Sequence, residues 1–270
     1  MIKVHSLSGG KTSSYMAVHY PADYNVFSLV GINAIDCQPK DKNLIQKVSD
    51  KIGKEFIATA EDDKTLYAMF DLEQLLGKEI IWVSGETFDD VIIRAGNYLP
   101  NKFRRFCTSE MKMKPIFKWW EKNFTDPILM GIGYRYDEKE RSERFTTEFK
   151  TVIGKRGSRN AWGIVKWRNG WFPLIENKIS YPSIIKWAND SNIKFPIDSN
   201  CIGCFHKPTQ QLRKNWEDHP CKMQWFANQE KKSKGNWKEN ENYESIKKIG
   251  LQSDFIFGTG SGCEAGYCTD

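Results

Sequence analysis

Short apolar runs alternate with helix-like stretches along residues 1–135 of the chain. The runs 1–7, 25–34, 55–58, 79–83 and 127–133 predict strands. The stretches 13–20, 42–52, 65–76, 88–95 and 111–124 carry apolar residues three and four positions apart, which predicts helices. Strands separated by helices are typical of a mostly parallel sheet with helices on both faces. The pattern therefore predicts an α/β fold.

The pattern changes in the second half of the chain. Residues 150–172 are rich in Gly, Lys, Arg and Trp and predict a β-hairpin that turns around Arg168-Asn169-Gly170. Two helices are expected at 182–193 and 210–232, and residues 258–270 form a Gly- and Cys-rich tail. We expect an α/β domain over 1–150 and, over 151–270, a hairpin, helical and Cys-rich region packed on it.

Composition narrows the class of protein. A chain of 270 residues with 40% hydrophobic and 27% charged residues can bury a substantial core. It has no run of roughly 18 to 20 apolar residues and begins with no secretory signal, so we expect a cytoplasmic protein with no membrane partner. The net charge of +6 allows anionic ligands or nucleic acid without requiring either.

A candidate phosphate loop follows the first predicted strand. It comprises Ser8, Gly9, Gly10, Lys11, Thr12 and Ser13. Free backbone N–H groups and the dipole of the following helix favour an anion there, and the glycines let the backbone approach it closely. The motif is not a Walker A loop, because His5 stands where that motif requires its first Gly. We predict a phosphate site rather than an ordinary capped Gly turn.

The cysteines suggest a second site. The seven are Cys37, Cys107, Cys201, Cys204, Cys221, Cys263 and Cys268. In a chain without an export signal they favour reduced thiols, a metal or redox chemistry over a disulfide framework. The spacing of Cys201 and Cys204 lets two thiolates meet one metal ion, and cations such as Lys112 would stabilise thiolates. Candidates for a further ligand are Cys221, His206 for zinc, and the two tail cysteines, which we favour.

The phosphate loop carries a family resemblance. Its sequence LSGGKTS is similar to the SGGKDS loop of adenine nucleotide alpha-hydrolase (PP-loop) proteins, with Thr12 where many members have Asp. Residues 104–116 resemble the CC-x-x-R-K-x-x-P-L segment of adenylyl-sulfate reductases, with Cys107 on the first Cys, Thr108 on the second and Lys112 on the Lys. Cys201 follows 94 residues after Cys107, a separation similar to the one that completes a four-iron cluster in that family.

Further stretches occur in the same order as in the family. Residues 130–138, with Arg135, resemble the G-x-R-x-x-E-S-x-x-R stretch that lines the nucleotide pocket, and an Arg there can bind phosphate or sulfate through two parallel hydrogen bonds. The chain is identified as a member of the phosphoadenosine phosphosulfate (PAPS)/adenylyl-sulfate reductase family. The resemblance implies a Rossmann-like parallel sheet of PP-loop type over 1–150, with a C-terminal cysteine-bearing appendage.

The resemblance also implies a site and cofactors. ATP or an adenylyl sulfate would be held by the loop from Ser8 to Ser13. The catalytic residues would be Cys107, Lys112 and Arg135. The ligands of a 4Fe-4S cluster, or of zinc, would be Cys107, Cys201, Cys204 and a tail cysteine, Cys263 or Cys268.

Three functions stay open. The first is sulfonucleotide reduction with a thioredoxin-like thiol donor. The second is ATP-dependent sulfur insertion into nucleic acid, DNA or tRNA, favoured by the basic stretch 155–159 beside Trp162 and Trp167. The third is a non-catalytic nucleotide-binding zinc protein, which Thr12 and Thr108 favour. The sequence leaves the oligomeric state open.

Overall fold

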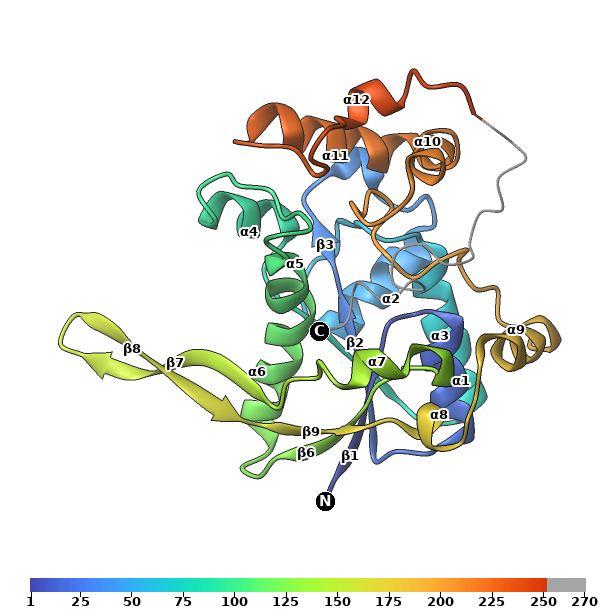
Figure 1. Ribbon diagram of the computed structural model, residues 1–270, viewed down its shortest axis with the longest axis vertical. Coiled ribbons are helices and arrows are strands. Elements are labelled where there is room, and N and C mark those ends of the chain that lie inside the picture. Colours follow the sequence, from blue (N-terminus) through green and yellow to red (C-terminus); the bar gives the residue numbers. More distant parts are fainter. Residues whose placement is uncertain (252–270) are drawn as a thin grey trace.

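A five-stranded parallel sheet forms the centre of the protein (Figure 1). The computed structural model describes residues 1–251. The strand order is β5-β2-β1-β6-β9, and all four neighbouring pairs are parallel. The strands are β1 (Lys3–Leu7), β2 (Tyr24–Leu29), β5 (Ile80–Ser84), β6 (Ile128–Gly131) and β9 (Arg168–Trp171). The predicted α/β class with a mostly parallel sheet is confirmed.

Helices cover both faces of this sheet. Along β2, Val26 packs into one apolar cluster together with Phe117 of α6, while the next residue, Phe27, packs into another with Leu66 of α3. Adjacent side chains of a strand point to opposite faces, so the two clusters are the two layers of a sandwich. The helices are α1 (Lys11–His19), α2 (Lys42–Ile52), α3 (Lys64–Leu76), α4 (Phe88–Arg94), α5 (Phe106–Thr108), α6 (Lys114–Asn123), α7 (Lys139–Ser142), α8 (Pro173–Glu176) and α9 (Tyr181–Asp190).

Local capping residues fix where several of these helices begin and end. The Asp41 carboxylate accepts hydrogen bonds from two backbone N–H groups at the start of α2, and Gly53 ends that helix in a left-handed conformation. The Thr87 hydroxyl and the Asp90 side chain form a capping box at the start of α4. A π-helical turn, Ser109–Met113, joins α5 to α6.

The predicted hairpin turn at Arg168-Asn169-Gly170 is wrong. The hairpin consists of β7 (Glu148–Arg156) and β8 (Arg159–Lys166), and it turns at Gly157, whose φ of 61° suits a tight turn. Asn169-Gly170 belongs instead to β9, whose parallel pairing with β6 makes it an edge strand of the main sheet. The sheet therefore takes one strand from beyond residue 150.

Two other elements differ from expectation. The run 55–58 contributes only β4 (Ala58–Thr59), which pairs antiparallel with β3 (Gly31–Ile32) outside the main sheet. The helix expected over 210–232 is two helices, α10 (Thr209–Asp218) and α11 (Pro220–Lys232). Pro220 lacks an N–H and disfavours helical geometry at the preceding residue, so the chain breaks at His219.

The C-terminal helices pack on the α/β unit through one apolar cluster. With α12 (Tyr243–Ile246), they contribute Trp216, Phe226 and Tyr243 to a cluster that also holds Ile32 of β3 and Phe88 of α4. Among residues 1–251, no helix has the length and apolar character needed to cross a bilayer. Cys263 and Cys268 lie outside the described residues.

Candidate functional site

The first functional candidate is a cavity where the strand order reverses. The chain runs outward from β1 through β2 to β5 and then returns to β6 on the other side of β1. In parallel α/β sheets, ligands bind at such a switch point, beyond the carboxyl ends of the strands. A cavity of ≈ 100 Å³ lies there, lined by Leu7 and Ser8 after β1 and by Ile132 and Gly133 after β6.

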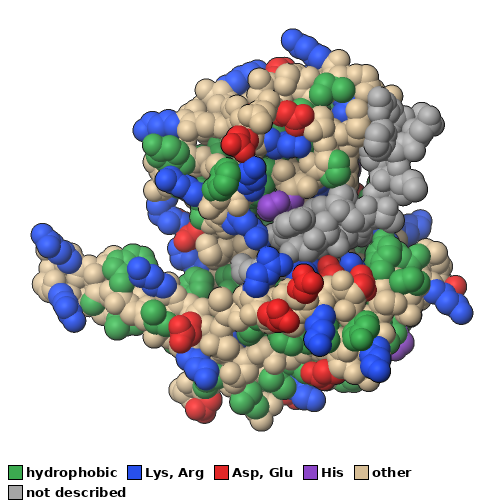
Figure 2. Space-filling view, viewed as in Figure 1, with side chains coloured by type: hydrophobic (Ala, Val, Ile, Leu, Met, Phe, Trp, Pro, Cys, Tyr) green, Lys and Arg blue, Asp and Glu red, His purple; other side chains and the backbone are tan. Residues whose placement is uncertain are grey.

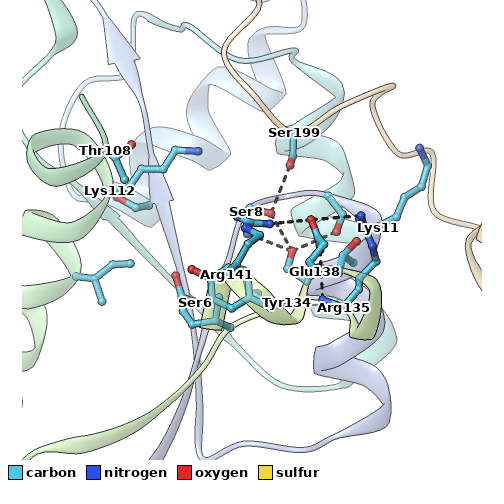
Figure 3. A pocket seen from close by; sticks show the side chains of 18 of the residues that line it. Ser6, Ser8, Lys11, Thr108, Lys112, Tyr134, Arg135, Glu138, Arg141 and Ser199 are labelled. Atoms are coloured by element: carbon cyan, nitrogen blue, oxygen red, sulfur yellow. Dashed lines mark hydrogen bonds and ion pairs between the residues drawn. The ribbon is translucent and has the colours of Figure 1, made fainter. Parts of the chain in front are cut away.

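The predicted phosphate loop forms one side of this cavity (Figure 3). Ser8, Gly10, Lys11, Thr12 and Ser13 line it, and Gly9 makes the turn with a φ of 77°. The Ser8 N–H donates to Ser13 Oγ at 3.2 Å, and the two hydroxyls lie 3.1 Å apart. α1 begins at Lys11 and runs for nine residues, so its first N–H groups, which lack acceptors within the helix, lie at the cavity.

A segment from the second half of the chain closes over the loop. The Ser199 hydroxyl donates to Ser8 Oγ at 3.4 Å, and Lys11 Nζ donates to the Ile197 carbonyl at 3.4 Å. A Cβ at Gly10 would lie 2.7 Å from Ser199 Oγ, so only glycine fits at Gly10 without displacing that side chain. No motif or spacing in the sequence pointed to Ser199.

Cationic side chains dominate the charge of the cavity. Its lining includes the cations Lys11, Lys112, Arg135, Arg141 and Arg168 and the acids Glu138 and Asp198. Arg135 and Arg141 are both buried, and both pair with Glu138 Oε1, at 3.2 Å and 2.8 Å. Asp198 pairs with the buried Lys207 at 3.0 Å. The excess positive charge, which includes three guanidinium groups, suits a polyanionic ligand.

Three cysteines predicted to act together line a second, smaller cavity, which we call the thiol cavity. Cys107, on α5, meets Cys201 and Cys204 of the loop before α10 around a volume of ≈ 50 Å³. Asn200 also lines it; its side chain is buried, and its amide atoms have no hydrogen-bond partner among the described residues. The structure thus brings together thiols separated by more than ninety residues of sequence.

Burial favours the neutral form of Cys107 and Cys201. It raises the pKa of Cys107 to about 11, with a smaller contribution from the nearby Cys204, and it raises the pKa of Cys201 well above its ordinary value. The positive charge of Lys112 acts in the opposite direction on both. The thiolate is the reactive and metal-binding form of cysteine. These cysteines therefore need a nearby cation that stabilises their thiolates.

Thr108 and Lys112 line both cavities. They follow Cys107 along the helical run that contains the π-helical turn, a distortion often found at functional sites. Lys112 Nζ pairs with Glu61 Oε1 at 3.1 Å, and Glu61 is fully buried. In Figure 3, Thr108 and Lys112 lie across the cavity from Ser8 and Arg135. The cavity lined by the predicted phosphate loop, which we call the phosphate cavity after that prediction, therefore shares a wall with the thiol cavity.

The described residues do not form a complete metal site. Within 1–251, no group of three Cys, His, Asp or Glu side chains is arranged to hold a metal ion. Cys221 and His206 do not line the thiol cavity. Cys221 is exposed and is close enough to Cys37 to help burial raise the pKa of Cys37 to about 11. Three of the predicted ligands share a cavity, and the predicted tail ligands fall outside the described part.

Comparison with known proteins gives one relative. The chain is 28% identical over 166 residues to the uncharacterized protein MJ0066 of Methanocaldococcus jannaschii. This match covers 60% of the chain but 34% of that protein, so the chain aligns with about a third of its relative's length. No protein-family model and no solved structure matches the chain. The relative's name gives no activity, so the function has to be inferred from the geometry of the site.

Proposed function

We propose that the protein is an enzyme of the PAPS-reductase family that binds ATP or an adenylyl sulfate and acts in sulfur transfer or sulfonucleotide reduction. One observation carries this proposal: Thr108 and Lys112 form the wall between the cationic phosphate cavity and the thiol cavity. A nucleotide held in the first cavity would present its reactive end to the thiols of the second.

The phosphate cavity has separate polar and apolar sides. The N-terminus of α1, the Ser8 and Ser13 hydroxyls and Arg135 would bind the phosphates. Ile116, Ile132 and Trp167 supply an apolar wall, which suits a purine base. This division of the lining supports an adenine nucleotide as the ligand.

Reduction of adenylyl sulfate would need a free thiol as the nucleophile. Because Cys107 is proposed as a cluster ligand, that thiol would be the tail cysteine, Cys263 or Cys268, that is not a ligand. Its thiolate would attack the sulfur, and the bond from sulfur to the bridging oxygen would break to release AMP. A thiolate from a thioredoxin-like donor would then attack the sulfur of that cysteine, forming a disulfide and releasing sulfite, so the two thiols supply the electron pair. Lys112 would favour the thiolate form of Cys107, and Arg135 would hold the leaving phosphate.

The proposal includes an iron–sulfur cluster, with zinc as the alternative. Cys107, Cys201 and Cys204 would be its ligands, and a cluster would hold in thiolate form the sulfurs of Cys107 and Cys201, whose pKa burial raises. The three thiols on one cavity support it, but the described residues supply only part of a ligand set, so we derive no step through the cluster.

A second function uses the same nucleotide cavity. In ATP-dependent sulfur insertion into nucleic acid, the bound ATP would adenylate the target and release pyrophosphate. The exposed basic hairpin, whose strand β8 is followed directly by the cavity-lining Trp167 and Arg168, favours it. One pair of assays distinguishes the two: sulfite release from adenylyl sulfate with reduced thioredoxin, and pyrophosphate release from ATP with added RNA or DNA. If the protein binds nucleotide but has neither activity, the enzymatic proposal fails and a binding role replaces it.

A further inference from the structure

The hairpin of β7 and β8, residues 148–166, projects from the body of the protein as an arm (Figure 1). Trp162 on this arm is 61% exposed, whereas Trp82, Trp120, Trp167, Trp216, Trp225 and Trp237 are at most 7% exposed. Val152 and Ile164 are exposed on the same face as Trp162, while Ile153 is exposed on the other face, over Gly163. Exposed apolar side chains grouped in this way mark an interaction surface.

The strand register places lysines on the face that carries Trp162. Val152 pairs with Trp162, and Lys150 pairs with Ile164. A bulge between Val152 and Gly154 then shifts the register by one residue, so that Lys155 pairs with Asn160. Asn160, Trp162 and Ile164 lie two residues apart and share a face, so the bulge brings Lys155 rather than Gly154 to that face. The tryptophan therefore lies between Lys150 and Lys155.

The arm concentrates the positive charge of the chain. It has five cations and one acid, Lys150, Lys155, Arg156, Arg159 and Lys166 against Glu148, which makes +4 of the total +6. Arg156 faces Arg159 across the strands at the tip, a like-charge pair that disfavours strand pairing. Among the described residues, no carboxylate forms an ion pair with any of the five cations. Figure 2 shows Lys and Arg side chains at the tip of the arm, with hydrophobic side chains between them and the body.

We propose that this arm binds single-stranded nucleic acid. A base would stack on the exposed Trp162 ring, with Val152 as the cross-strand apolar partner, while the lysines and arginines bind phosphates. Unpaired cations alternating with an exposed aromatic ring match a polymer that alternates phosphates with flat bases.

The position of the arm relative to the phosphate cavity indicates the direction in which a bound nucleic acid would run. β7 has nine residues, so the arm is roughly 30 Å long. β8 continues directly into Trp167 and Arg168, which line the phosphate cavity. A single-stranded nucleic acid bound along the arm would therefore be directed toward that cavity. Binding by the arm does not depend on which chemistry occurs there.

Fluorescence anisotropy with labelled DNA and RNA single strands about 12 nucleotides long tests the proposal. Trp162→Ala should weaken binding roughly 5- to 150-fold, and Trp162→Phe should keep most of the affinity, because a phenyl ring still stacks. The triple variant Lys155→Glu, Arg156→Glu, Arg159→Glu should reduce the slope of log affinity against log salt by roughly 2, since each lost phosphate contact on a single strand contributes about 0.7.

A matched triple variant controls for net charge. Lys40→Glu, Lys42→Glu and Lys64→Glu change exposed residues away from the arm, and both triples change the net charge from +6 to 6 − 3 × 2 = 0. The control should bind nucleic acid more tightly than the arm triple. Calorimetric titration with ATP should give wild-type affinity for all arm variants, which separates failure of the arm from failure of the nucleotide site.

Several results would overturn the proposal. One is the absence of binding to either single strand at about 50 mM salt. A second is an equal loss of affinity for single strands in the arm triple variant and the control triple variant. A third is an equal loss of that affinity in Trp162→Phe and Trp162→Ala. Preference for duplex over single strands would exclude the stacking role. Binding of anionic lipid vesicles, or self-association, that requires Trp162 while neither oligonucleotide binds would assign the arm to a membrane or to a second copy of the chain.

Discussion

Lys112 and Glu61 form an ion pair of 3.1 Å inside the wall between the two cavities. The Glu61 side chain is fully buried, and burial raises its pKa while Lys112 opposes that rise. The Glu61 carbonyl also accepts a hydrogen bond from Lys222, which pairs with Asp63 at 2.7 Å. Lys112 is thus held at the wall by a buried partner, in contact with both cavities.

Substitution of Lys112 should show how much the Lys112–Glu61 ion pair contributes to stability. Lys112→Met leaves the buried Glu61 carboxylate without its cation, which should lower the free energy of unfolding in urea by about 3 kcal/mol. The double variant Lys112→Met, Glu61→Gln removes both charges and should recover most of that stability. Both variants should bind ATP less tightly than wild type. If the double variant is no more stable than the single variant, the pair does not account for the loss.

The phosphate loop should not tolerate a side chain at Gly10. In Gly10→Ala the new methyl group would lie 2.7 Å from Ser199 Oγ, so the loop or Ser199 must move. We expect roughly tenfold weaker ATP binding by calorimetry, the loss of about one hydrogen bond to a charged group. Adding Ser199→Gly should restore affinity by making room. Gly154→Ala, where the methyl group meets nothing within 4 Å, is the matched control.

Contiguous motifs could be predicted from the sequence, because their signals are local. The loop from Ser8 to Ser13 lies between β1 and α1 as expected, and Arg135 and Lys112 line the same cavity. Ser199, Trp167 and Arg168 could not be assigned to the cavity, because they reach it only through the tertiary fold. No periodicity or spacing in the sequence relates those segments to the phosphate loop.

The errors in element assignment come from local sequence signals that tertiary pairing overrode or that were weak. Asn169-Gly170 is a strong hairpin signal, but its conformation is decided by pairing with residues of β6 forty positions earlier in the sequence. The true turn at Gly157-Ser158 is a weaker signal within a charged stretch. Pro220 was the available signal for the break between α10 and α11, and the apolar spacing on either side of it masked that signal.

Metal content should depend on the thiol cavity. After anaerobic purification, we expect iron and acid-labile sulfide together in the wild type and their loss in Cys107→Ala and Cys204→Ala, because both residues line that cavity. Cys221→Ser, which changes an exposed cysteine outside the cavity, should keep the wild-type content. Cys268→Ala tests the predicted tail ligand. Zinc without sulfide would favour the zinc alternative, and metal retained in Cys107→Ala would exclude the proposed ligand set.

Stability should fall in mild acid because of His5. This residue is fully buried in β1, its Nε2–H donates to the Tyr20 carbonyl at 2.6 Å, and its ring stacks on Trp171 with centroids 5.1 Å apart. Burial lowers the pKa of His5 from 6.5 to about 4. Between these values the unfolded state binds a proton that the folded state does not, so stability decreases as the pH falls.

From pH 7 to pH 5 this single group should remove about 2 kcal/mol from the free energy of unfolding. Urea unfolding at the two pH values measures the loss. His5→Gln, whose amide can still donate to the Tyr20 carbonyl, should be less stable at pH 7 yet show a smaller loss at pH 5. His19→Gln, at the end of α1, should keep the wild-type loss. Imidazole NMR signals identify the group directly, and a His5 resonance that titrates near pH 6.5 would contradict the assignment.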